Sequence, residues 1–180
     1  IKQGTMQQLL TGKTRLPGFS YNINDNLKKF KLFNMVQPHP AKSPMTKNEI
    51  VIFLGMEDIS NEGRILIQHE KSLSEIKKGL TYFERNDILV AKITPCFENG
   101  KGACLDSLKR EKGFGSTEFH VLRANVNACS RYIFYHTQLE EFRKRLENEM
   151  VGTAGQKRVP YQAIINYPLP IIHSLSEQTA

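Results

Sequence analysis

The spacing of the apolar residues changes once along the chain, near residue 130, and this change most limits how the chain can fold. From Glu49 to Leu122 the apolar residues come in short runs rich in branched side chains, which is typical of β-strands. From residue 130 to residue 150 they recur every three or four positions, with charged residues on the opposite face. This spacing predicts an amphipathic helix of about five turns that starts at an N-cap, Ser130, and ends at Gly152. The apolar face expected to pack in the core consists of Tyr132, Tyr135, Leu139, Phe142, Leu146 and Met150.

The β-rich part is expected to contain several short strands. The apolar runs that predict them are 50–54, 64–67, 87–94 and 116–122. Asn99 and Gly100 form a dipeptide that favours a tight hairpin turn, so the segments PCFE and KGACLD on either side of it are expected to pair. In residues 116–122 apolar and polar side chains alternate, which predicts a half-buried strand. The sequence therefore predicts the α+β fold class.

Both ends of the sequence look like helices that are cut short. Residues 1–11 place Leu9 and Leu10 at helical spacing, and Gly12 is suited to cap that helix in a left-handed conformation. At the other end Ser174 and Glu177 have the spacing of a capping box, which predicts the start of a helix. The chain begins at Ile rather than Met, so we expect it to be a segment of a longer protein. The stretches 13–19 and 34–48 are expected to be a linker and a loop, and 163–172 an extended return strand.

The net charge of +7 is unevenly distributed. Residues 49–180 hold 17 basic and 17 acidic residues, whereas residues 1–48 hold a single acidic residue, Asp25. The eight basic residues of that first part are Lys2, Lys13, Arg15, Lys28, Lys29, Lys31, Lys42 and Lys47. A local basic surplus favours an acidic partner, most often nucleic acid, and the alternative is a lysine-rich surface without a partner.

The remaining composition argues against a membrane protein and against a metal site. No apolar run approaches the roughly 18 residues that a membrane span needs, and no signal peptide is recognisable, so a cytoplasmic protein is expected. The cysteines Cys96, Cys104 and Cys129 are odd in number and have no C-x-x-C spacing. None of the five histidines clusters with them, so we expect reduced thiols, no metal and no cofactor.

The string GTAGQKR at 152–158 is the strongest local candidate for a binding site. It is not a phosphate-binding P-loop, because it follows a helix and lacks the final hydroxyl residue. It does offer side chains suited to phosphates and base edges, namely Thr153, Gln156, Lys157 and Arg158. The alternative is a glycine-capped helix end with solvated charges.

Two further strings place polar residues at strand ends. The expected hairpin ITPCFENGKG, with the strand that leads into it, would present Lys92, Thr94, Glu98, Asn99 and Lys101. The string GFGST would present Ser116 and Thr117, with Glu118 directly after them. It lacks the G-x-S-x-G order of a nucleophile elbow. The alternatives are a plain hairpin and a glycine-hinged loop.

One catalytic constellation is worth naming. Asp58, Glu75 and Lys77 loosely follow the order of acidic and basic residues in metal-dependent nucleases, in which the side chains converge on magnesium. Here the surrounding sequence KSLSEIKKGL is polar and helix-like, so the match is weak. No nucleophile with a matched base stands out, and the sequence argues against an enzyme active site.

Four strings, taken in order, resemble the specificity subunits of type I restriction–modification systems. They are QGTMQQLLTGKTRLPGF, NDILVAKITPCFENGKGA, GSTEFHVLRA and GTAGQKRVPYQAIINYPLPIIHSLSEQ. The resemblance covers nearly the whole chain and is strongest over 152–178. It implies a module that is not catalytic on its own and that reads double-stranded DNA. Its implied partners are methyltransferase subunits and, through them, restriction subunits, and the stand-alone nuclease remains the alternative.

The resemblance also implies a domain organisation. Specificity subunits carry two target recognition domains separated by two long helices that pack as an antiparallel coiled coil. In this chain residues 1–19 would be the end of one spacer helix and a linker, residues 20–170 one recognition domain, and residues 171–180 the start of the next spacer helix. A helix that precedes the domain suggests the second of the two domains. The resemblance does not locate the residues that read bases.

Overall fold

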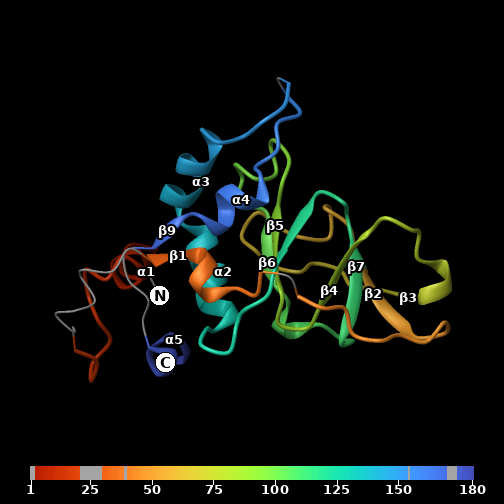
Figure 1. Cartoon of the computed structure of the whole chain (residues 1–180), viewed down its shortest axis with the longest axis horizontal. Coiled ribbons are helices and arrows are strands. Elements are labelled where there is room, and N and C mark those ends of the chain that lie inside the picture. Colours follow the sequence, from red (N-terminus) through yellow and green to blue (C-terminus); the bar gives the residue numbers. More distant parts are fainter. Residues whose placement is uncertain (1–2, 21–29, 39, 154, 170–173) are drawn as a thin grey trace.

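The computed structural model describes residues 3–20, 30–38, 40–153, 155–169 and 174–180, and it confirms the α+β fold class (Figure 1). The helices are α1 (Gln3–Leu10), α2 (Ser130–Gln138), α3 (Glu140–Glu147), α4 (Tyr161–Ile165) and α5 (Leu175–Thr179), with 3-10 turns η2 (Leu32–Met35), η3 (Leu73–Glu75) and η4 (Leu105–Ser107). The strands are β1 (Phe30–Lys31), β2 (Ile50–Leu54), β3 (His69–Ser72), β4 (Thr81–Glu84), β5 (Ile88–Ala91), β6 (Gly102–Cys104), β7 (Lys112–Gly115), β8 (Phe119–Leu122) and β9 (Pro168–Leu169).

Two sheets form the β-rich part. One has the order β3-β2-β7-β4, in which β2 and β7 run parallel and the other neighbours are antiparallel. The other has the order β6-β5-β8 and is antiparallel throughout. Gly113 allows β7 to lie against its neighbours, because a Cβ atom there would come within 2.2 Å of the Phe83 ring. The small β1–β9 sheet lies apart from both, beside the helices.

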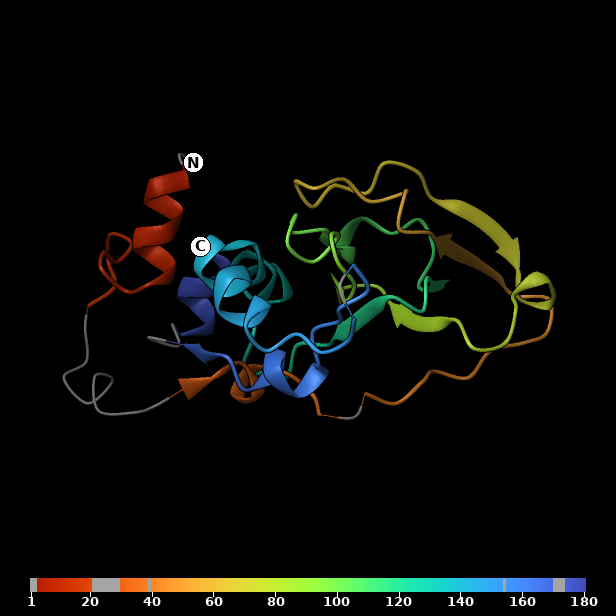
Figure 2. The same ribbon diagram turned by 90° about the horizontal axis from the view of Figure 1, so that it is seen from above.

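Strand β5 is buried on both faces and separates two hydrophobic cores. Leu89 and Ala91 pack into a core shared with the four-stranded sheet, whereas Ile88 and Val90 pack into a core shared with α2, α3 and α4. Because successive side chains of a strand point to opposite faces, a nearly continuous apolar run is what such a strand requires. The β6-β5-β8 sheet therefore lies between the helices and the other sheet (Figures 1 and 2).

The expected helix over residues 130–150 is two helices. Leu139 has φ −65° and ψ 135°, which is extended backbone, and it separates α2 from α3. Nη1 of Arg143 donates to the Gln138 carbonyl at 2.6 Å, which satisfies a group that an unbroken helix would have bonded internally. The N-cap is Cys129 rather than Ser130. Of the expected apolar face, Tyr132, Phe142 and Leu146 are buried, whereas Tyr135, Leu139 and Met150 are half-buried. The second helix ends at Glu147 rather than at Gly152.

Three further expectations of secondary structure were wrong. Residues 64–67 are not a strand: Leu66 and Ile67 are 60% and 55% exposed, and the sheet edge is the polar strand β3, whose outer side needs no apolar residues. Residues 95–100 form helix-like turns rather than a tight hairpin, with the Asn99 amide donating to the Pro95 carbonyl at 3.1 Å. The return segment begins with the helix α4 because its apolar residues pack inward, and only β9 is extended.

The two chain ends lie at the same end of the molecule. The helix α1 ends before Gly12, whose φ of 71° confirms the expected left-handed cap. The helix α5 starts at Ser174, whose side chain accepts a hydrogen bond from the Glu177 amide as expected. Figures 1 and 2 place α1 and α5 beside one another, away from β3. Within the described residues no coiled coil is visible, and residues 170–173 of the predicted return and spacer lie outside them.

Candidate nucleic-acid interface

Most of the polar residues singled out in the sequence meet at one edge of the fold. The Lys92 amide donates to the Glu118 carbonyl at 2.8 Å, and the Val159 amide donates to the Lys92 carbonyl at 2.9 Å. The Thr94 amide donates to the Lys157 carbonyl at 3.0 Å. Three segments that are distant in sequence, namely the end of β5, the start of β8 and the segment after α3, are therefore joined through their backbones.

A projecting loop carries four of these residues. The peptide groups of Val151 and Arg158 exchange two hydrogen bonds of 3.0 and 2.8 Å, which close the loop at its base. Gly152 has a φ of 127°, and a Cβ atom there would come within 2.7 Å of the Gln156 carbonyl oxygen, so glycine is required. Thr153, Gln156 and Lys157 are exposed on the loop, which projects at the top of Figure 1. Ala154 lies outside the described residues.

Arg158 forms a forked ion pair with Glu118. Its Nε donates to both carboxylate oxygens at 3.1 and 3.0 Å, and its Nη2 donates to Oε1 at 2.8 Å. The hydrogen bond from Arg158 lowers the pKa of Glu118, so the carboxylate is charged at neutral pH. The sequence did not connect Glu118 with Arg158, because the two residues lie 40 positions apart and no local pattern links them.

Lys92 lies beside this pair but is partly withdrawn from solvent. Its ammonium group donates to the Thr117 carbonyl at 2.7 Å. Burial lowers the pKa of Lys92, and the neighbouring Glu118 carboxylate opposes that shift. Ser116 accepts a hydrogen bond from the Glu118 amide at 3.2 Å, so this hydroxyl shapes the turn that leads into β8.

His120 connects β8 to the segment that follows the loop. Its Nε2 donates to the Val159 carbonyl at 2.8 Å, and its ring lies 5.6 Å from the Tyr161 ring between centroids. Burial lowers the pKa of His120 to about 4, so the imidazole is neutral at pH 7. His120 is therefore a structural support that no local sequence pattern indicates.

Three predicted site residues contact other parts of the protein. The Lys101 ammonium donates to the Met56 carbonyl at 2.9 Å, and the Thr94 hydroxyl donates to Glu98 Oε1 at 2.8 Å. Asn99 is exposed and borders a cavity of about 590 Å³ that residues of α1, α2 and α3 also line. A role of these side chains in DNA binding stays a prediction.

The nuclease residues do not form a site. Asp58 is buried, accepting hydrogen bonds from the Gly55 amide at 2.6 Å and from Nε2 of His69 at 2.9 Å. Glu75 instead accepts from the Ser72 amide at 2.7 Å within its own turn. Across the described part of the chain, no group of three or more His, Cys, Asp or Glu residues could hold a metal ion. The three cysteines are free thiols.

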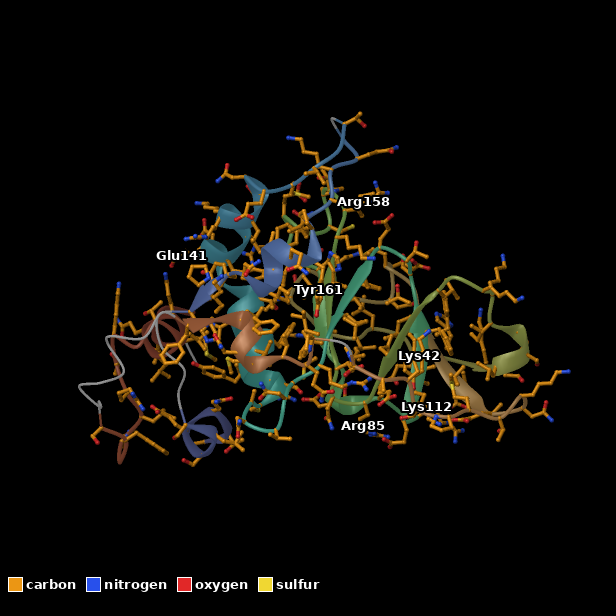
Figure 3. The ribbon with its side chains drawn as sticks, in the orientation of Figure 1. Lys42, Arg85, Lys112, Glu141, Arg158 and Tyr161 are labelled. Carbon is orange, nitrogen blue, oxygen red and sulfur yellow. The ribbon has the colours of Figure 1, made fainter. Side chains whose placement is uncertain are left out.

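Two of the described basic residues of the first 48 positions, Lys42 and Arg15, lie away from this edge. Lys42 lies over the Tyr82 ring, 5.5 Å from its centroid, and Arg15 pairs with Glu177. In Figure 3 Lys42 lies on the lower side of the molecule, far from Arg158 at the top. Lys2, Lys28 and Lys29 lie outside the described residues.

No helix in the described part of the chain is long and apolar enough to cross a membrane.

No protein-family model matches the chain, whereas two curated proteins do. The type I restriction enzyme EcoAI specificity subunit of Escherichia coli is 45% identical over 177 residues, which are 94% of this chain and 29% of that protein. The EcoEI specificity subunit of the same species is 43% identical over 104 residues, which are 57% of this chain and 18% of that protein. The chain thus spans less than a third of the length of these relatives.

Solved structures share the fold. The crystal structure of the HsdS subunit from Thermoanaerobacter tengcongensis matches with a TM-score of 0.65 and 19% identity, over 84% of this chain and 39% of that chain. A chain from a structural study of the assembly of the type I R-M system matches with a TM-score of 0.64 and 19% identity, over 79% and 37%. At this sequence identity the structural matches establish only the fold. The sequence identity to the curated relatives shows that the chain belongs to the specificity subunits of type I restriction enzymes.

Proposed function

We propose that this segment recognises a specific sequence of double-stranded DNA as one target recognition domain of a type I specificity subunit. The observation that carries the proposal is the convergence of Lys92, Thr117, Lys157 and Arg158 from three segments onto one edge of a rigid sheet. A sheet edge fixes side chains well enough to aim them into a groove.

The side chains at this edge fit both tasks of a DNA reader. Lys157 is exposed on the projecting loop and is suited to a phosphate, which supplies affinity without sequence information. Gln156 and Thr153 are exposed beside it, and a glutamine amide is suited to the edge of adenine. We infer that the loop enters or borders a groove, with Lys157 on the backbone.

The domain organisation follows from the same proposal. We assign residues 20–170 to the recognition domain, and residues 1–19 and 171–180 to the ends of two spacer helices with their linkers. The adjacency of α1 and α5 supports this assignment, because two helices that leave the domain side by side can continue as an antiparallel pair. Methyltransferase subunits, and through them restriction subunits, are the proposed partners. The segment itself would be non-catalytic, and the complex would act in the cytoplasm.

The test is a selection from randomised DNA duplexes by the full-length subunit bound to its methyltransferase. We expect enrichment of one short sequence whose identity changes when this segment is exchanged for that of another subunit. A selected sequence that stays the same after the exchange would contradict the proposal. Incubation of the same complex with magnesium and its selected duplex tests separately for cleavage, and none is expected.

A further inference from the structure

The guanidinium of Arg158 has two hydrogen-bond donors left at its outer end. A guanidinium carries five N–H groups. Nε and Nη2 donate to Glu118, and Nη1 donates to the Gln156 carbonyl at 3.3 Å. One N–H group remains on each of the two terminal nitrogens, and within the described residues neither has a further acceptor. The Arg158 side chain is 45% exposed, so this end is accessible.

Both partners of the ion pair are anchored by the backbone. The Arg158 peptide is bonded to Val151 at the base of the loop, and its neighbour Val159 is bonded to Lys92. Glu118 holds its place through its carbonyl, which accepts from the Lys92 amide, and through its own amide, which donates to Ser116. The Arg158 side chain is consequently held in one orientation before any ligand arrives, which reduces the entropy lost on binding.

We propose that Glu118 is a positioning residue that presents the outer end of Arg158 to the N7 and O6 atoms of a guanine in DNA. This inference rests on the proposed function. Two parallel N–H groups match the acceptors of guanine in the major groove. A phosphate would fit the same fork, but the Glu118 carboxylate beside the guanidinium cancels the charge that a phosphate site needs. Recognition of a base edge depends on the direction of the two N–H groups more than on the net charge. The ion pair with Glu118 therefore favours a base over a phosphate as the ligand of Arg158.

The experiment uses the full-length subunit bound to its methyltransferase, the duplex selected from randomised DNA and single-base variants of that duplex. Arg158→Ala is expected to lower the preference for one guanine by roughly 5- to 150-fold, with other positions unaffected. Replacement of that guanine by 7-deazaguanine, which lacks N7, should weaken binding by the parent and not by Arg158→Ala. Arg158→Lys keeps the charge but loses the fork, so it is expected to lose the same preference without a change in salt dependence.

Glu118→Gln separates positioning from support of the fold. It should lower the preference at the same guanine, and the double variant with Arg158→Ala should lose no more than Arg158→Ala alone. It should also raise affinity for scrambled duplexes, because a negative charge is removed from the DNA side. Glu70→Gln is the matched control. Glu70 forms a similar fork with Arg110, with hydrogen bonds of 3.0 and 3.1 Å, and this fork lies elsewhere in the fold. It is expected to change neither quantity.

The contrary outcomes are distinct. Equal weakening of all duplexes by Arg158→Ala, with the salt slope reduced by about 0.9, would mean a phosphate contact and would overturn the proposal. If the parent subunit selects a sequence and both Glu118→Gln and Arg158→Ala keep its preference at every position, this inference alone is overturned. A parent subunit that selects no sequence would overturn the proposed function and this inference together.

Discussion

Nε of Arg15 donates to Oε1 of Glu177 at 2.8 Å, and Nη2 of the same guanidinium bonds the other carboxylate oxygen. The two residues lie 162 positions apart, in the linker after α1 and in α5. Their side chains are only 10% and 3% exposed. The pair therefore joins the two ends of the chain through buried charges, at the place where the proposed spacer helices leave the domain.

The first prediction concerns this pair. Arg15→Ala leaves the Glu177 carboxylate buried without its fork, and we expect a loss of about 3–5 kcal/mol in the free energy of unfolding. Urea denaturation measures it. Glu140→Gln breaks the exposed pair with Lys144 and is the control, with an expected change below about 1 kcal/mol. A loss for Arg15→Ala as small as that of the control would mean that the pair does not hold the ends together.

The second prediction concerns the core of the helical part. Leu146→Ala should cost about 2–5 kcal/mol of stability, because Leu146 is fully buried and its truncation leaves a cavity. DNA sequence preference of the folded fraction should be unchanged. Val126→Ala, at a side chain that is 88% exposed, is the control and should stay within about 0.5 kcal/mol of the parent. Altered preference in the folded Leu146→Ala protein would place α3 closer to DNA than we infer.

The third prediction concerns Lys157. Lys157→Gln should weaken binding to all duplexes by a similar factor and reduce the log–log salt slope by about 0.9, since one phosphate contact is lost. Filter binding between low and moderate salt measures the slope. Lys144→Gln removes an exposed lysine from α3 and should leave the slope as it is. An unchanged slope for Lys157→Gln would show that the loop faces away from DNA.

The fourth prediction is a pH dependence. Burial lowers the pKa of His120 to about 4, from an ordinary value of 6.5, so between these values the unfolded chain binds a proton that the folded protein does not. The stability that this histidine contributes is complete above pH 6.5 and is lost as the pH falls toward 4, by up to about 3 kcal/mol.

His120→Gln isolates this contribution, because a glutamine amide can still donate to the Val159 carbonyl but does not titrate. Urea denaturation of parent and variant at pH 7 and pH 5 gives the comparison. The variant should lose less stability over this interval than the parent. Equal losses would assign the pH dependence to other groups.

The elements predicted well from the sequence are those that local patterns specify. β2 occupies 50–54 as predicted, because a branched apolar run is sufficient for a buried strand. Gly12 caps the C-terminal end of α1, and Ser174 caps the N-terminal end of α5. Both capping roles depend on neighbours within a few residues. The break at Leu139 was missed, because the apolar spacing continues through it.

The site was predicted as a set of residue types rather than as an arrangement. Lys157 and Arg158 were found because a glycine-rich string with cations is recognisable locally. The partner of Arg158 could not be found in this way, since Glu118 reaches it only after β8 and the loop are brought together. Asn99 and Lys101 are predicted site residues because the sequence favours a hairpin at Asn99 and Gly100, and the turns at 95–100 direct them to other neighbours.

The closure of the loop at Val151 and Arg158 bears on how such a protein changes over generations. Two backbone hydrogen bonds seal its base, and the described residues between them are exposed, so the interior gains little from what the loop contains. Mutations there escape the usual cost of disturbing a packed core, and surface loops accept insertions readily. New side chains can thus appear at the tip of the loop while the rest of the fold stays unchanged. Under the proposed function, such changes would alter the DNA sequence that is recognised without requiring a new fold.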